Sequence, residues 1–139
     1  WTGDARLITY SSTDGFAESG MDATGAVRGF GWEDIWVLAT GLQVRPVRRL
    51  ALRTGYNFTE NPVPAAQSAF NVPAPAIVQH HLTLGAGLQL DGLRVDVGYY
   101  HAFSNRITGD FPTPAGSMSV TNEMFEDSFL LSFSFTPSS

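Results

Sequence analysis

Three histidines are the residues of this chain that most directly suggest chemistry. His80 and His81 are neighbours and His101 follows in the next strand-like segment, and imidazole nitrogens are common zinc ligands. A strand, however, points adjacent side chains to opposite faces. If residues 77–90 form a strand, His80 and His101 share one face and His81 points to the other. We therefore predict no metal site here, and the absence of cysteine removes thiolate ligands and disulfides as well.

A second group of residues suggests binding rather than reaction. Arg53, Arg94 and Asp96 are charged positions in segments that alternate between apolar and polar residues. They could bind a carboxylate or hold an internal plug segment, or they could form an ion-pair ladder that only stiffens a wall. Serine, histidine and aspartate are all present, but no motif positions them as a hydrolytic triad. We therefore predict no catalytic residue and no cofactor, and we keep an outer-membrane hydrolase only as a minor alternative.

The segment that must position most of these side chains is IVQHHLTLGAGLQLDGLRVDVGYYHAFSN, residues 77–105. Its Asp91-Gly92 dipeptide lies between alternating apolar runs, which predicts a hairpin with a two-residue type I′ turn. Such a turn sets Leu88 opposite Val95. All apolar pairs then fall on one face, and polar or glycine pairs fall on the other. A slip of one residue would mix the faces, so the register is strongly specified.

The remaining segments repeat this alternation. We expect six strands, at residues 5–12, 33–44, 50–59, 77–90, 93–105 and 125–135. Long loops separate them at residues 13–31, 60–76 and 106–124, and they alternate with short turns at residues 45–49 and 91–92. In an up-and-down meander the short turns then share one end of the sheet and the long loops share the other. This asymmetry is typical of outer-membrane barrels.

Composition supports a membrane setting. Charged residues make up 15% of the 139 positions, below the roughly 25% usual in soluble domains. No stretch approaches the roughly 20 apolar residues of a membrane helix, and the net charge of −5 argues against nucleic acid as a partner. The expected fold class is all-β: an antiparallel up-and-down meander of about six strands, part of a transmembrane β-barrel. The alternative is a small soluble β-barrel or β-sandwich that binds a ligand or partner without transport.

Aromatic and aliphatic residues divide the expected strands into two functional faces. The predicted aromatic girdle consists of Trp32, Trp36, Tyr56, Phe58, Tyr99 and Phe103 at the long-loop ends and Phe133 and Phe135 at the opposite ends. The other face would line a lumen, and three of its residues in one strand are aliphatic, which favours apolar molecules over a water-filled pore. The lumen-lining candidates are Ile35, Val37, Ala39, Arg53, Asn57, Gln89, Arg94, Asp96, Tyr100 and Leu130.

Three segments carry a resemblance to a known family. LALRTGYNFTENPVP (residues 50–64), PAPAIVQHHLTLGAGLQL (73–90) and LRVDVGYYHAF (93–103) resemble the C-terminal part of the FadL/TodX family of outer-membrane transporters for hydrophobic compounds. The segment FLLSFSF (129–135) resembles the terminal strand that outer-membrane proteins present to their insertion machinery. The resemblance implies a location in the bacterial outer membrane and passive uptake of long-chain fatty acids or other hydrophobic molecules, without catalysis.

The resemblance also implies that this chain is part of a larger barrel. Family members carry an N-terminal plug, and we expect residues 1–139 to form a C-terminal barrel segment with no plug present. Six strands do not enclose a lumen, since about eight are the usual minimum, and open edges are costly in hydrocarbon. We therefore expect a fragment whose edges pair with the rest of the barrel or with other chains. The other expected partners are outer-membrane lipid and a hydrophobic small-molecule substrate.

Overall fold

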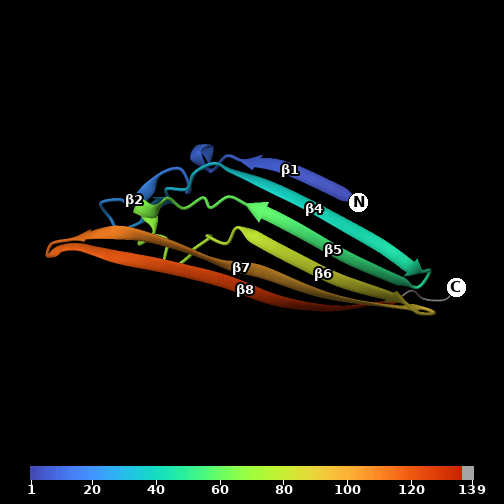
Figure 1. The fold of residues 1–139 in the computed structure, drawn as a ribbon. Helices are drawn as coiled ribbons and strands as arrows, with labels where there is room; N and C mark the ends of the chain where they lie inside the picture. Colours follow the sequence, from blue (N-terminus) through green and yellow to red (C-terminus); the bar gives the residue numbers. More distant parts are fainter. Residues whose placement is uncertain (136–139) are drawn as a thin grey trace.

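The computed structural model describes residues 1–135, and these form an antiparallel sheet in the order β1-β4-β5-β6-β7-β8 (Figure 1). Two short strands between β1 and β4 form a separate hairpin. The main strands are β1 (Thr2–Ile8), β4 (Ile35–Val47), β5 (Leu50–Thr59), β6 (His80–Gln89), β7 (Leu93–Thr113) and β8 (Gly116–Phe135), and the small ones are β2 (Ser19–Met21) and β3 (Val27–Phe30). The expected all-β meander of six strands is confirmed. Within residues 1–135, none of the helical segments has the length and apolar character that a membrane span requires.

The central hairpin has the predicted register. Leu88 lies opposite Val95 and Gln89 lies opposite Arg94. The turn type, however, was predicted wrongly, because a type I′ turn needs positive φ at both central residues. Gly92 has a φ of 75°, whereas no residue other than glycine has positive φ. The register is nevertheless retained, since it depends on the two-residue length of the loop.

The β4–β5 connection is tighter than the sequence indicates. Instead of a turn over residues 45–49, β4 continues to Val47 and only two residues separate it from β5. The register shifts between Val44 and Val47, at the position of Pro46, which has no amide hydrogen to donate to the ladder. Val44 consequently pairs with Leu52. A turn over residues 45–49 would instead pair Val44 with Leu50, so the observed pairing is displaced by two residues and each side chain keeps its face.

The third long loop, expected at residues 106–124, is instead a continuation of β7 and β8. The two strands remain paired up to Thr113 and Gly116, after a register shift between Ala102 and Asn105. Figure 1 shows this extension reaching beyond the other strands. Most of its pairs contain at least one polar residue, such as Thr108 with Thr121, whose hydroxyls lie 2.8 Å apart. The apolar alternation that identifies the other strands is therefore missing here, which explains the wrong prediction.

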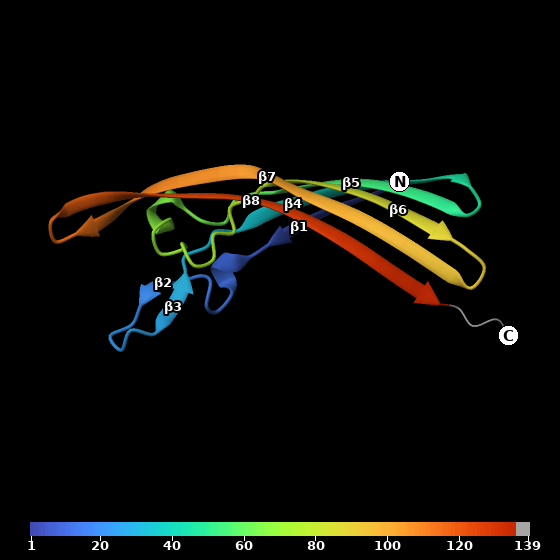
Figure 2. The same ribbon diagram turned by 90° about the horizontal axis from the view of Figure 1, so that it is seen from below.

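The two faces of the sheet differ in exposure and in what covers them. Figure 2 shows a bent sheet with the β2–β3 hairpin and the segment between β5 and β6 on one side. On the opposite face, which we call the outer face, no second layer covers the described strands, and its aliphatic side chains are exposed, for example Leu38, Leu42, Leu52, Leu84, Val97 and Leu131. A soluble sandwich would bury such a row against another sheet, whereas lipid can cover it.

The small buried core lies where the long segments fold over one end of the sheet. Ile35, Val63, Ile77 and Ala102 are the most buried apolar residues, each at most 3% exposed. The first long segment, residues 13–31, contains the β2–β3 hairpin, and the second, residues 60–76, contains the short 3-10 turn η2 (Ala65–Gln67). The tail expected after the last strand, residues 136–139, lies outside the described residues.

Candidate functional site

The register places all ten lumen-lining candidates on one face of the sheet, opposite the outer face. Ala39 pairs with Asn57, Arg53 with Gly85, and Gly85 with Gly98. Because paired residues lie on the same face, these positions share one face across four strands. We call this face the inner wall. Its candidates are Ile35, Val37 and Ala39 on β4, Arg53 and Asn57 on β5, Gln89 on β6, Arg94, Asp96 and Tyr100 on β7, and Leu130 on β8. Their role in binding remains a prediction.

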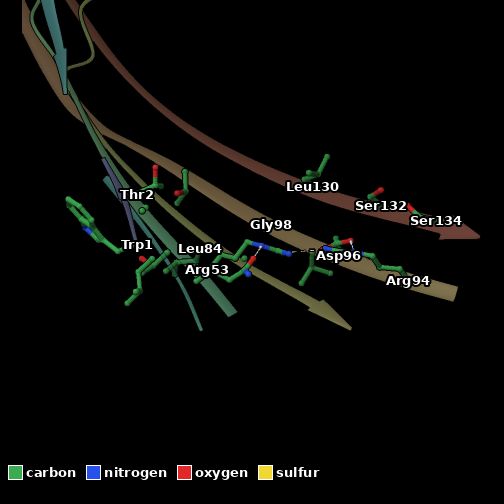
Figure 3. Close-up of a pocket in the computed structure, with 18 residues that line it drawn as sticks. Trp1, Thr2, Arg53, Leu84, Arg94, Asp96, Gly98, Leu130, Ser132 and Ser134 are labelled. Atoms are coloured by element: carbon green, nitrogen blue, oxygen red, sulfur yellow. Dashed lines mark hydrogen bonds and ion pairs between the residues drawn. The ribbon is translucent and has the colours of Figure 1, made fainter. Parts of the chain in front are cut away.

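Three charged residues of the inner wall, Arg53, Arg94 and Asp96, form one connected network (Figure 3). Arg94 Nε lies 2.6 Å from Asp96 Oδ2, and Arg53 Nη1 lies 3.1 Å from Asp96 Oδ1. The other side of the Arg53 guanidinium donates from Nε to Gln43 Oε1 at 2.8 Å. Two guanidinium groups thus share one carboxylate, which leaves one positive charge without a partner in the network. This geometry is the ion-pair ladder considered from the sequence.

Beside this network, several inner-wall positions are glycines and therefore have no side chain. Gly41 pairs with Gly55 and Gly85 pairs with Gly98, so a band of the wall presents backbone rather than side chains. An open hollow of about 1030 Å³ follows this band and extends to Arg53 and the β8 edge (Figure 3). The sequence indicated inward glycines, but only the pairing shows that four of them form two directly opposed pairs.

A smaller hollow lies further toward the long-loop end of the inner wall. It has a volume of about 400 Å³, and most of its lining side chains are polar, including Asn57, Thr83, His81 and Tyr100. The imidazole of His81 stacks on Tyr100 with ring centroids 5.4 Å apart. Strand parity in the sequence already placed His81 on the face opposite His80 and His101, but His81 was not among the predicted lumen-lining residues.

The predicted aromatic girdle lies on the outer face, with one exception. Trp36, Tyr56, Phe58, Tyr99 and Phe103 belong to the outer-face positions at the long-loop end, and Phe133 and Phe135 to those at the other end. The polar ends of two of these aromatic side chains have hydrogen-bonding partners. The Tyr56 hydroxyl lies 2.6 Å from His80 Nδ1. The Tyr99 hydroxyl donates to Asp127 Oδ1 at 2.5 Å, and the same oxygen lies 2.7 Å from His101 Nδ1. Aromatic rings with hydrogen-bonded tips are typical of a membrane interface.

Trp32 is the exception, because it lies in the folded long segments and not on the outer face. Its ring packs at 5.0 Å from both Tyr10 and Phe16. Its Nε1 donates to Asn71 Oδ1 at 2.7 Å, and the Asn71 amide donates in turn to Phe30 O and Gln67 O, both at 3.0 Å. These long-range contacts join the first two long segments into one cluster. The sequence could not show them because the partners are about 40 residues apart.

Two further asparagines attach the second long segment to the β7–β8 extension. Asn122 Nδ2 donates to Ser68 O at 2.7 Å, and Asn105 Nδ2 donates to Ile77 O at 2.6 Å. Because both donors lie on the inner-wall side of the hairpin, residues 60–79 are held over the long-loop end of the inner wall. These residues therefore cover the long-loop end of the inner wall, whereas the glycine band remains uncovered.

A comparison with protein families supplies the identity of the chain. A family model described as outer membrane protein transport protein (OMPP1/FadL/TodX) matches residues 1–123. The match begins earlier than the resemblance seen from residue 50, and it ends within β8. A search of curated proteins gave no match. The chain therefore belongs to the FadL/TodX family of bacterial outer-membrane transport proteins.

Proposed function

We propose that this chain forms part of the wall of a channel for passive uptake of long-chain fatty acids or other hydrophobic molecules. The observation that carries the proposal is the glycine band of the inner wall, which leaves an open hollow of about 1030 Å³. Aliphatic Val37 and Ala39 occupy successive inner-wall positions on β4, whereas Ile35, the third aliphatic candidate of this strand, is buried in the core under the long segments. A water-filled porin would instead carry polar side chains there.

Passage along such a wall requires no covalent chemistry. The free energy of an apolar molecule falls when it leaves water for the wall, roughly in proportion to the apolar area that becomes buried. The glycines let it approach the backbone without displacing side chains. The uncompensated positive charge of the Arg53–Asp96–Arg94 network could orient a carboxylate at one end of the path. The proposal therefore assigns no catalytic role to any residue.

The partners proposed for the chain follow from its two faces and two edges. The exposed aliphatic row of the outer face would contact outer-membrane lipid between the aromatic girdles. β1 and β8 each lack one neighbour within the described sheet, and the rest of the barrel or other chains would pair with them. A ligand-binding protein without transport is the second candidate, but the exposed outer face disfavours its soluble form.

The test is a substitution that fills the hollow without disturbing the fold. A Cβ added at Gly85 meets its nearest atoms at 3.5 and 3.7 Å, which is ordinary contact, so Gly85→Phe places a ring over the glycine band. In the full-length natural protein expressed in cells, we expect this variant to lose most uptake of labelled fatty acid and hydrocarbon. Leu84→Phe, on the outer face of the same strand, is the control and retains uptake. Normal uptake by a folded Gly85→Phe protein would refute the proposal.

A further inference from the structure

The short-turn end of the inner wall concentrates positive charge around a separate hollow of about 190 Å³, which we call the arginine hollow. Five of the eight basic residues of the chain line it: Arg45 of β4, Arg48 and Arg49 of the β4–β5 turn, Arg53 of β5 and Arg94 of β7. Within residues 1–135, no acidic side chain is among those that line this hollow. The chain as a whole has a net charge of −5, so the cluster has the opposite sign to the rest of the molecule.

Two carboxylates contact these arginines and do not neutralise them. One is Asp91, whose Oδ1 lies 2.9 Å from Arg49 Nη2, and the other is Asp96 of the network described above. Among the described residues, neither Arg45 nor Arg48 forms an ion pair. Five arginines and two carboxylates leave a formal excess of three positive charges. Like charges around one hollow repel one another, and an anion bound between them would relieve that repulsion.

Contacts between the two short turns position the turn arginines beside the wall arginines. The backbone amide of Gln89 donates to Arg49 O at 2.7 Å, which joins the β4–β5 turn to the end of β6. Gly87 lies between Ala51 and Asp96 in the strand pairing, and a Cβ at Gly87 would collide with the Asp96 carboxylate. Glycine at this position therefore lets Arg53 reach across β6 to Asp96.

The arginine hollow is accessible and is continuous with the glycine band. The side chains of Arg49, Arg53 and Arg94 are 62%, 36% and 42% exposed, respectively. Arg53 and Arg94 also line the larger hollow of about 1030 Å³ (Figure 3). A molecule with its charged end among the arginines could therefore lay its apolar body on the glycine band.

The chemistry of the lining favours a phosphate group over a carboxylate. Arginine pairs with the oxygens of both groups. A carboxylate offers two oxygens in one plane and one negative charge, whereas a phosphate monoester offers three terminal oxygens and a charge of about −1.5 to −2 near neutral pH. The phosphate group matches better because the arginines approach from both the turn and the wall and carry an excess of three charges. We propose, resting on the channel function above, that the arginine hollow binds the phosphate group of single-chain alkyl phosphates whose apolar chain lies on the glycine band.

The experiment compares decyl phosphate, decanoate, 1-decanol and inorganic phosphate on the full-length natural protein in an uncharged detergent. Affinities are measured by titration calorimetry at one ionic strength against matched detergent blanks, and we expect decyl phosphate to bind most tightly. The double variant Arg45→Gln/Arg48→Gln removes two charged donors from the hollow, so its affinity for decyl phosphate should fall about tenfold, with decanol binding unchanged. Arg6→Gln/Arg28→Gln is the matched control, because it removes the same charge from arginines that pair with carboxylates outside the hollow.

Asp96→Asn provides a second test with the opposite sign. It removes the carboxylate that competes for Arg53 and Arg94, so we expect its affinity for decyl phosphate to rise roughly two- to fivefold. A purely structural role of the network would not produce tighter binding. This variant also keeps the proposal testable if the double arginine variant does not fold.

Several outcomes would overturn the proposal. They are an unchanged affinity for decyl phosphate in the folded double variant, an equal loss in its control, and no gain in folded Asp96→Asn. Binding of decanoate or inorganic phosphate to the natural protein as tight as that of decyl phosphate would also overturn it. If decanol still binds in these cases, only the phosphate site is wrong and the channel function stands. If none of the three decyl ligands binds the natural protein, both proposals fail.

Discussion

At the scale of single residues, side chains with several hydrogen bonds organise the parts of the chain that have no regular alternation. Asn71 is fully buried, and its side chain makes three hydrogen bonds, to Trp32, Phe30 and Gln67. Breaking buried hydrogen bonds of this kind lowers the stability of the fold by more than an exposed ion pair adds to it. Asn71 therefore fixes the long segments over the inner wall, although nothing in its local sequence distinguishes it from a loop asparagine.

The Arg106–Glu123 pair makes the β7–β8 extension sensitive to acid. Arg106 Nη2 lies 2.6 Å from Glu123 Oε2, and Ser104 donates to the same carboxylate at 3.0 Å. Both hold the pKa of Glu123 below its ordinary value of 4.5. A carboxyl whose pKa is lowered by folding stabilises the fold above its unfolded pKa, and that contribution is lost as the pH falls through the lowered pKa. We therefore expect the small contribution of this exposed pair to stability to be present at neutral pH and to be lost under acid conditions.

This sensitivity is measured by titrating the Glu123 carboxyl carbon by NMR. In Arg106→Gln the main cause of the lowered pKa is absent, so we expect the pKa of Glu123 to rise toward 4.5. Arg28→Gln breaks a comparable exposed pair with Glu18, 2.9 Å apart in another segment, and should leave the Glu123 titration unchanged. An identical titration of Glu123 in the natural and Arg106→Gln proteins would show that the pair does not exist in solution.

At the scale of elements, strand alternation decides whether a side chain lies on the outer face or on the inner wall. Leu131 and Ser132 are neighbours on β8, yet the first lies opposite Val97 on the outer face and the second opposite Asp96 on the inner wall. Leu131 also lies between the Tyr99–Phe129 and Val95–Phe133 pairs, within the aliphatic part of the outer face. The same substitution at the two positions therefore has different consequences.

We expect Leu131→Arg to destabilise the membrane-inserted protein by about 2–4 kcal/mol, the cost of an arginine facing lipid near the bilayer midplane. Ser132→Arg, the control one residue away, faces the hollow beside Asp96 and should cost far less. Denaturant titration of the protein in lipid vesicles, followed by heat-modifiable gel migration, measures both. Equal losses in the two variants would contradict the assignment of the faces.

At the scale of the whole molecule, the sheet is one continuous wall with two unpaired edges. Its outer face carries exposed aliphatic and aromatic residues, including Phe129 at 83% and Phe135 at 76% exposure. Such a surface is unfavourable in water, and unpaired strand edges are unfavourable in lipid. These two features support the proposal that lipid covers the outer face and that other strands pair with the edges of the described sheet.

Refolding the 139-residue chain alone tests this requirement. We expect strand structure by circular dichroism only when detergent micelles are present, with the protein in associated species whose edges pair. Without detergent we expect aggregation. A cooperatively folded, water-soluble monomer would contradict the membrane assignment and support the ligand-binding alternative.

Much of the fold could be predicted because alternation and turn length act locally. The pairing of Leu88 with Val95 follows from two residues, Asp91 and Gly92, and the face of every residue of the central hairpin follows from that pairing. Cross-strand neighbours in a hairpin are close in sequence, so the register needs little information from the rest of the chain. Strand alternation likewise predicted the face on which the lumen-lining candidates and the aromatic residues lie, Trp32 excepted.

The tertiary structure alone decided the parts that depend on distant partners. Trp32 lies in the folded segments because of its contact with Asn71, 39 residues away, which local patterns do not encode. Sequence thus determined which side chains share a face, because strand parity is a property of the backbone. Which of them are covered, paired or left open was determined by how long-range segments pack onto the sheet, because burial and hydrogen bonding depend on the neighbours that folding supplies.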